Sequence, residues 1–318
     1  MSKIIIRQSK ILVNCTMFPA SDKKHWSLLL LAVLLWLHFP AVSLAQTITI
    51  YTIPAARSIK WESPGKLVKS YLANLFTRKY KGTQRHLIGH MIVELKDSSR
   101  HVIAGVSARK NAGMTRKVLF QRHGLGILLE KVDGVMEETD INKPDIFQRS
   151  INGSIAFVEF TISQPAFERT WDYFTTYKER GYDHIYNWLN QPLAGKGAGC
   201  SSFAFSFLEV AGVSDMIPPE ICRIERNIPA DLAYLPGGKT RPVSLFRLLF
   251  SRKWAAANDP EALHYSTYEP TWLYNWIRAN HAVLPADGII QKTWLKNAPG
   301  ILIDCRNRPV PQGSLWEN

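Results

Sequence analysis

A glycine-rich turn that leads directly into an apolar helix is the feature that most limits how this chain can fold. The stretch covers Gly197–Gly212 and reads GAGCSSFAFSFLEVAG. Its first glycines allow a tight backbone turn, Ser201 and Ser202 can cap a helix, and Phe203–Ala211 has helical periodicity up to the closing glycine. Because few of these residues are polar, we expect the helix to be largely buried and the fold to be organised around it.

Cys200 occupies the junction between the turn and the helix. A thiol at the first turn of a helix meets unpaired backbone N–H groups and the positive end of the helix dipole, which favour the thiolate. This is the environment of a nucleophilic cysteine. The alternative is a small, inert, buried cysteine, which is a common fate for this residue type.

The N-terminal segment has the pattern of a secretory leader. A basic flank is followed by an apolar run and then by small residues, which predicts a signal peptide over residues 1–45 with cleavage after Ala45. Translation from Met17 instead of Met1 would give a leader of ordinary length, and an uncleaved anchor is the alternative. We therefore expect a periplasmic or secreted protein. In this leader, the basic flank is Lys23 and Lys24, the apolar run is Trp26–Leu37, and the small residues are Ser43 and Ala45.

The chain is basic, with a formal net charge of +13 over 318 residues. The leader has five basic residues and one acidic residue, a net +4, so +9 remains on residues 46–318. Outside the cytoplasm such a surface suits anionic cell-wall polymers or lipid headgroups better than nucleic acid, and no base-reading motif is present. We expect no nucleic-acid partner and a peripheral contact with membranes through the basic surface.

Cysteine usage supports a free thiol at the helix. Removal of Cys15 with the leader leaves Cys200, Cys222 and Cys305, an odd number in an oxidising compartment. A disulfide between Cys222 and Cys305 would tie the C-terminal tail to the segment after the helix and leave Cys200 unpaired.

Alternation and helical spacing predict a mixture of strands and helices. Met91, Val93 and Leu95 share one face of a strand, which puts His90 and Glu94 on the other face. The region 214–318 changes character toward proline and aromatic residues, so we expect a C-terminal extension after a domain at 46–213. The strands are expected at 47–53, 86–95, 101–107, 126–129 and 154–160, and the helices at 64–78, 163–180, 203–211, 243–254 and 271–279.

A cysteine hydrolase needs a base within reach of the thiol and a group that orients the base. His90, on the strand face away from the main hydrophobic side, is the best candidate base. The third position stays open between His101, Ser107 and Glu94, which all belong to the same hairpin, because the register of the strands decides which one reaches His90.

Other chemistries fit less well. His86 and His90 have the spacing of two metal ligands on one strand face, but no nearby pair of ligands completes a site, so we expect no metal and no cofactor. Ser201 or Ser202 as the nucleophile would need the Gly-x-Ser-x-Gly elbow, which is absent.

The order of these motifs resembles that of the circularly permuted NlpC/P60 papain-like proteins, which include the lecithin:retinol acyltransferase relatives. The residues that carry the resemblance lie between about 80 and 213: Gly89-His90 on a strand, a second strand, Ile162-Ser163-Gln164 opening a helix, Tyr182, and Cys200-Ser201-Ser202-Phe203. The resemblance implies a nucleophilic Cys200, a base at His90, a polar residue of the following strand in third place, and Tyr182 near the oxyanion. The chain departs from it at Gly199, where many relatives have asparagine.

Together these features predict an α+β papain-like domain, with an antiparallel sheet packed on the helix that bears the nucleophilic cysteine. The expected function is that of a secreted thiol hydrolase that cleaves amide bonds of cell-wall peptides by Cys–His acyl transfer. The alternatives are a lipid or lipoprotein acyl hydrolase or acyltransferase of the envelope, and a non-catalytic envelope binding protein on the same fold.

Overall fold

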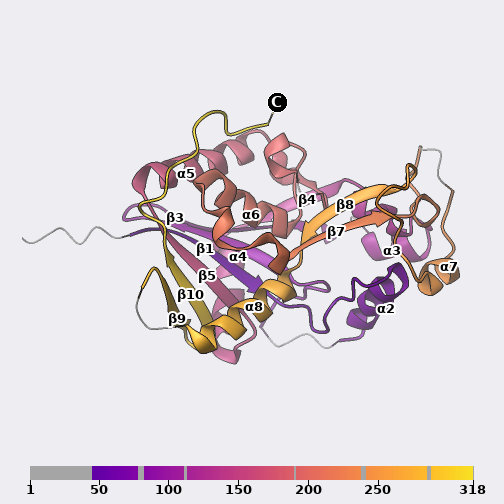
Figure 1. The fold of residues 1–318 in the computed structure, drawn as a ribbon, viewed down its shortest axis with the longest axis horizontal. Helices are drawn as coiled ribbons and strands as arrows, with labels where there is room; N and C mark the ends of the chain where they lie inside the picture. The colour runs from indigo at the N-terminus through magenta and orange to yellow at the C-terminus, as the bar shows by residue number, and fades with distance from the viewer. Residues whose placement is uncertain are drawn as a thin grey trace, which may run out of the picture. The chain divides into compact units, whose positions relative to one another are not determined.

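The protein is an α+β structure built around one large sheet (Figure 1). The computed structural model describes residues 45–77, 82–110, 113–189, 191–237, 241–284 and 288–317. These residues form one compact unit. The expected signal peptide, with Met17 and Cys15, lies outside the described residues except for Ala45.

Eight strands form the main sheet, in the order β6-β4-β3-β2-β1-β5-β10-β9. All neighbouring pairs are antiparallel except β5 and β10, which are parallel. The strands are β1 (Gln46–Ile53), β2 (His90–Lys96), β3 (His101–Ala108), β4 (Val132–Glu137), β5 (Ala156–Ile162), β6 (Ile185–Tyr186), β9 (Ile290–Leu295) and β10 (Ala298–Asp304). The sheet is therefore mixed but mostly antiparallel, and its centre is the alternating strand β1.

Side-chain alternation divides the sheet into two faces. One face carries Ile48 and Ile50 of β1 and Met91 of β2, and it packs against α5 (Gln164–Glu179), α6 (Cys200–Ala211) and α8 (Pro270–Val283). The other face carries Ile53 and Ile92 and packs against α4 (Thr139–Asn152). Because the first face is the more apolar one, the hydrophobic helix α6 is buried there.

The helix α6 begins at Cys200 itself, three residues earlier than the periodicity suggested. Gly199 is the N-cap and no side chain caps the helix, so the expected capping by Ser201 or Ser202 is not seen. Instead, the Ser202 hydroxyl donates to the carbonyls of Leu189 and Gly199, both at 3.2 Å. The helix ends as expected at Gly212, whose φ of 74° is in the left-handed region.

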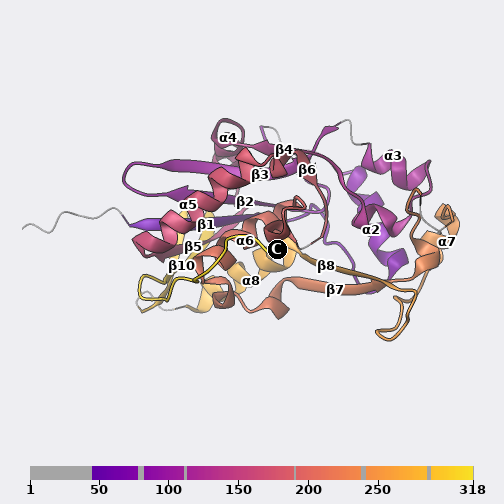
Figure 2. The same ribbon diagram turned by 90° about the horizontal axis from the view of Figure 1, so that it is seen from above.

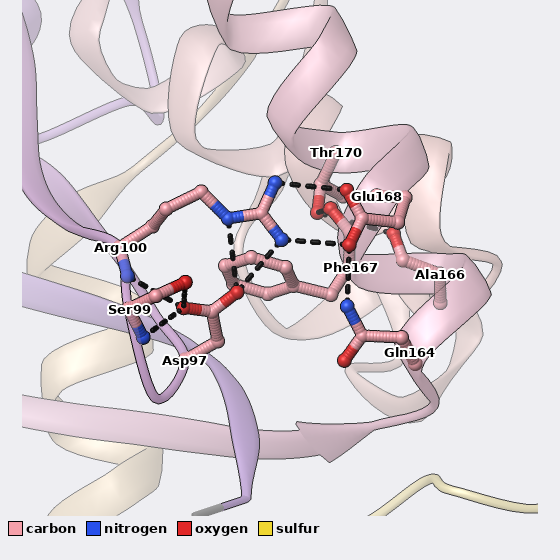
Figure 3. A network of polar contacts seen from close by, with 8 residues as sticks. All are labelled: Asp97, Ser99, Arg100, Gln164, Ala166, Phe167, Glu168 and Thr170. Atoms are coloured by element: carbon pink, nitrogen blue, oxygen red, sulfur yellow. Dashed lines mark hydrogen bonds and ion pairs between the residues drawn. The ribbon is translucent and has the colours of Figure 1, made fainter.

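The turn between β2 and β3 is tied to the start of α5 by a charged network (Figure 3). The Arg100 guanidinium donates two bonds to the Glu168 carboxylate, at 2.7 and 2.8 Å, and further bonds to Asp97. It also lies over the ring of Phe167, 4.9 Å from the ring centroid. This paired, stacked geometry holds the hairpin against the helix.

A second group of elements surrounds a smaller apolar core beside the sheet. The amide of Gly65 in α2 donates to the Ser251 carbonyl at 2.9 Å, and the hydroxyls of Tyr71 in α2 and Thr115 in α3 are 2.8 Å apart. These contacts join the helices to one another. The group consists of α2 (Pro64–Leu75), α3 (Met114–Leu119), the 3-10 helix Leu125–Leu129, α7 (Leu245–Phe250) and the hairpin of β7 (Arg223–Ile228) and β8 (Leu263–Tyr268).

Several sequence expectations differ from the structure. The apolar run at 126–129 is part of a 3-10 helix, not a strand, since a short apolar run does not distinguish the two. The helix expected at 243–254 covers only 245–250, and the one at 271–279 extends over 270–283. The region 214–318, expected as a C-terminal extension, supplies β9 and β10 to the main sheet and α8 to its core.

Candidate active site

Cys200 lies where the start of α6 meets the start of β2. Its side chain is buried, and its sulfur is 3.8 Å from the Ser201 hydroxyl and within hydrogen-bonding reach of the Met91 amide. Burial raises the pKa of the thiol above its ordinary value, although the backbone N–H groups of Met91, Ser201 and Cys200 act in the opposite direction. The helix start therefore does not produce the low thiol pKa that the sequence suggested, because loss of water outweighs the N–H groups.

Tyr186, on the short strand β6, is a second polar neighbour of this cysteine. Its hydroxyl lies close enough to the backbone N–H and the thiol of Cys200 to interact with both. Burial, followed by the proximity of Cys200, raises the pKa of Tyr186 well above its usual value, so the phenol stays protonated. A protonated hydroxyl beside the nucleophile is able to donate to an oxyanion.

His90 is the first residue of β2 and directly precedes Met91, but its imidazole points to the other face of the sheet. A Cβ built on Gly105 would lie 3.1 Å from its Nε2, which places the ring against β3 on the side of α4. Nε2 is buried and makes no hydrogen bond to the described residues. Burial, and then the nearby His86, hold the pKa of His90 well below its ordinary value, so its imidazole is neutral.

His86 stacks on His90, with ring centroids 4.2 Å apart and planes 1° from parallel. Its Nε2 is 3.7 Å from Oδ2 of Asp145, which also accepts a bond of 2.9 Å from Arg149. Burial alone would raise the pKa of Asp145, but His86 and Arg149 lower it below its ordinary value, so the carboxylate is charged. Sequence analysis did not single out Asp145, since nothing in its helix distinguishes it from the neighbouring charges.

The expected nucleophile and base line one polar cleft at the end of the sheet, although their side chains lie on opposite faces of it. Cys200 and His90 both line it, as do His86, Ser107 and Tyr186. β2 and β3 pair only from Val93 and Ala104 onward, so the two strands separate where the cleft lies. No hydrogen bond joins Cys200 to His90 among the described residues. Catalytic hydrogen bonds are often long in unliganded enzymes, so both residues remain candidates.

Of the three residues proposed for the third position, Ser107 alone lines this cleft. Its hydroxyl lies near the Glu137 carboxyl and lowers the pKa of that group, but burial has the larger effect and raises it. His101 and Glu94 are hydrogen-bonded to each other at 2.6 Å, and His101 pairs with Lys96 at the other end of β2. Lys96 lies six positions along the strand from His90, a distance of about 20 Å, so its partner His101 does not orient this imidazole.

Tyr182, expected near the oxyanion, instead packs among aromatic side chains. Its ring centroid is 5.7 Å from that of Tyr177 and 5.2 Å from that of Trp316. It lines neither the polar cleft nor the apolar cavity described below. Tyr186, four residues later, occupies the position beside the thiol, and the sequence offered no signal to choose between the two.

Cys200 and Tyr186 also line a second, apolar cavity, which lies between the sheet edge and the helices α2 and α3. The cavity has a volume of about 100 Å³, which is smaller than a pocket that holds a whole drug-sized ligand. Most of its wall is apolar. The wall includes Trp61, Leu67, Val68, Met114, Val118, Leu125, Leu128 and Tyr265.

The charged group in the wall of this apolar cavity is the side chain of Glu269, the N-cap of α8. One carboxyl oxygen, Oε2, accepts a bond of 2.7 Å from the Trp272 amide. The other, Oε1, is buried and has no hydrogen-bond partner among the described residues. Burial raises the pKa of Glu269 to about 7.

The remaining cysteines do not form the expected disulfide. Cys200, Cys222 and Cys305 are all free and buried thiols. Burial raises the pKa of Cys222 to about 12 and that of Cys305 to about 11, so both are protonated at neutral pH.

Two further results concern the chain as a whole. In the described part of the chain, no helix has the length and apolar character needed to cross a bilayer. Comparisons of the chain with protein-family models, with curated proteins and with solved structures found no match.

Proposed function

We propose that the protein is a thiol acyl-transfer enzyme that acts on lipid acyl chains, with Cys200 as the nucleophile. The observation that carries the proposal is the position of this cysteine in the wall of the apolar cavity. An acyl chain gains about 0.8 kcal/mol for each methylene that it buries, whereas a peptide backbone needs hydrogen-bond partners that this wall lacks. This favours the lipid alternative over the cell-wall peptide that the sequence suggested first.

In the proposed reaction, the Cys200 thiol transfers its proton to the His90 imidazole and the sulfur attacks the carbonyl carbon of an ester. The oxyanion accepts hydrogen bonds from the Tyr186 hydroxyl and the Met91 amide. The C–O bond then breaks, the imidazolium returns its proton to the leaving alcohol, and a thioester remains on the sulfur. Water or an acceptor amine then attacks the thioester carbonyl while His90 takes its proton. The C–S bond breaks, and the imidazolium returns the proton to the sulfur, which restores the thiol.

For this proton transfer, the imidazole of His90 turns about its side-chain bonds into the cleft that it shares with Cys200. Its Nε2 has no partner among the described residues, and burial keeps the imidazole neutral. The lowered pKa makes the buried imidazole a weak base, so the transfer depends on its gaining solvent and polar neighbours in the cleft. Before it turns, the ring is held by its stack on His86, which in turn lies beside Asp145.

The proposed fold relationship is the one that the sequence resembles, a circularly permuted papain-like domain. Its support is the order of a histidine at the start of a strand and a cysteine at the start of a helix packed on the same sheet. The proposed compartment is the cell envelope outside the cytoplasm, on the evidence of the leader-like sequence.

The test is to detect the acyl-enzyme. Purified protein is incubated with a phospholipid that carries a labelled acyl chain, and intact-mass spectrometry should show the mass of one acyl group on the wild type. The adduct should be lost with hydroxylamine and absent from C200A, while the matched buried-thiol control C222A still forms it. Acylation of C200A at the wild-type level would remove the proposal.

A second pair of variants tests the oxyanion role. Y186F should slow acylation by about 10²- to 10³-fold, because one oxyanion donor is lost. Y182F, which changes a tyrosine outside both pockets, should leave the rate unchanged. Equal effects of the two substitutions would contradict the role given to Tyr186.

Hydrolysis of wall peptides is the second candidate. One observation favours it: the polar cleft beside Cys200 carries the cationic side chains of Arg85, Arg109, Lys110 and Arg116, which suit peptide carboxylates. Release of peptide fragments from purified peptidoglycan by the wild type but not by C200A, with no lipid acylation, would select this function.

The third candidate is a binding protein without catalysis. The raised thiol pKa and the direction of the His90 ring are consistent with it. Slow alkylation of Cys200 at mildly acidic pH does not separate it from the enzyme, since burial produces the same result. Retention of an acyl lipid with no covalent adduct would distinguish a binding protein from the enzyme.

A further inference from the structure

The helices α2, α3 and α7 carry an unusual combination of exposed aromatic and basic side chains. In both ribbon views these helices gather at one end of the folded unit, away from β9 and α5 (Figures 1 and 2). We use the name helical lobe for residues 64–77, 113–122 and 241–253. The same helices α2 and α3 form part of the wall of the apolar cavity.

Four phenylalanines of the helical lobe project into solvent. Phe76 is 87% exposed, Phe120 77%, Phe246 71% and Phe250 58%. Phe246 and Phe250 lie side by side on α7, with ring centroids 4.4 Å apart, and the Lys69 ammonium of α2 lies 5.1 Å from the Phe250 centroid. Phe246 and Phe250 form an exposed aromatic pair, and two further exposed phenylalanines lie on the neighbouring helices at the same end of the unit. Exposed large aromatic side chains of this kind suggest a partner.

The charges of the helical lobe are all of one sign. Its three segments contain nine basic residues and no aspartate or glutamate. Lys117 pairs with Glu130 and Arg247 with Asp231, both acids outside the lobe segments. The other seven form no ion pair with a described residue: Lys66, Lys69, Arg116, Arg122, Arg241, Arg252 and Lys253.

We propose that the helical lobe docks on an anionic phospholipid bilayer, with its phenylalanines in the acyl boundary and its basic side chains among the headgroups. Aromatic side chains surrounded by lysine and arginine are the signature of interfacial binding. This proposal extends the proposed function and rests on it for the role of the cavity. Docking would bring the lipid to α2 and α3, which form part of the wall of the cavity that Cys200 also lines. The docking itself depends only on the surface.

The experiment measures partitioning onto phosphatidylcholine vesicles with and without phosphatidylglycerol, by co-sedimentation of the C200S protein so that no turnover occurs. We expect binding to the anionic vesicles, weaker binding to neutral ones, and a loss of affinity as salt is raised. Tryptophan at position 246 (F246W) should show a blue-shifted emission that brominated phospholipid quenches.

Matched variants locate the binding surface. F246S/F250S should lower the partition coefficient at least about tenfold, because each phenyl ring contributes more than 1.4 kcal/mol on burial. R252E/K253E should lower it for anionic vesicles alone. The controls F147S and K143E/K292E alter exposed residues outside the lobe and should bind as the parent does. All these side chains are exposed, so circular dichroism and thermal unfolding should match the parent.

Absence of binding to anionic vesicles, or undiminished binding by F246S/F250S, would overturn the proposal. Conversion of a dimer to a monomer by F246S/F250S would show instead that the face joins two copies of the chain. Vesicle binding by a protein that never forms an acyl-enzyme would leave docking in place and remove the proposed function. Acylation by a soluble short-chain ester without vesicle binding would leave the proposed function in place and remove the docking proposal.

Discussion

At the scale of single residues, the sequence singled out Cys200 and His90 as candidates but did not predict how their side chains are oriented. Alternation along β2 put His90 on the face opposite Met91, and this is where the structure has it. What alternation does not tell is which face α6 covers. The apolar helix packs on the more apolar face, so Cys200 and the imidazole lie on opposite sides of the strand and have only the cleft at its end in common.

Residues that act through burial were also out of reach of the sequence. Glu269 was not singled out, because a carboxylate before a proline and a helix reads as an ordinary cap. Its raised pKa arises from segments that are distant in the chain, and desolvation is the largest cause.

The raised pKa of Glu269 has a consequence for stability. The carboxyl has a pKa of about 7 in the folded protein, against an ordinary value of 4.5, so the folded state holds its proton more tightly than the unfolded state does. The free energy of unfolding therefore falls as the pH rises from 4.5 to about 7, by roughly 3 kcal/mol, and is constant above that window with respect to this group.

E269Q should remove that part of the pH dependence. Urea unfolding at about pH 5 and about pH 8 should show the variant gaining stability relative to the wild type at the higher pH. The neighbouring substitution E261Q alters an exposed carboxylate and serves as the control. A variant whose pH profile parallels the wild type would show that the carboxyl is ionised without penalty.

At the scale of elements, local signals were reliable where capping and periodicity agreed. Ser163 followed by Gln164-Pro165 marks the start of α5, and its hydroxyl accepts from the Ala166 amide as expected. The approach to α6 was also correct in outline. Gly197 has a φ of +75°, and a Cβ there would lie 2.2 Å from the Ile185 carbonyl oxygen.

G197A should therefore unsettle the start of α6. We expect it to cost more than about 2 kcal/mol, because the strain of a positive φ is joined by a collision with backbone. G237A is the matched control, since Gly237 has a φ of +83° with nothing within 4 Å of its Cβ position. Chemical denaturation measures both, and equal losses would show that the contact with Ile185 is unimportant.

At the scale of the whole molecule, the sequence pointed to an α+β fold but not to the pairing that completes it. Strong alternation identified β1, β2, β3 and β5. Nothing local indicates that β10 lies parallel to β5, with Ile301 opposite Val158, across more than a hundred intervening residues. Such non-local pairing is fixed by the joint burial of both strands.

Because of this pairing, a chain that ends at Val213 should not fold. The truncation removes Leu273, Ile277, Ile301 and Ile303 from the main core. We expect no near-ultraviolet circular dichroism and no cooperative unfolding transition. A chain that ends at Arg308 keeps β10 and α8 and should fold with reduced stability. A cooperative transition in the shorter chain would show that residues 46–213 are an independent domain.

The position of β10 near the end of the chain also affects how the protein is made. A ribosome has translated almost the whole message before residues 298–304 emerge, and until then β5 exposes an unsatisfied edge. We therefore expect the nascent polypeptide to be prone to aggregation until β10 is available to complete the sheet.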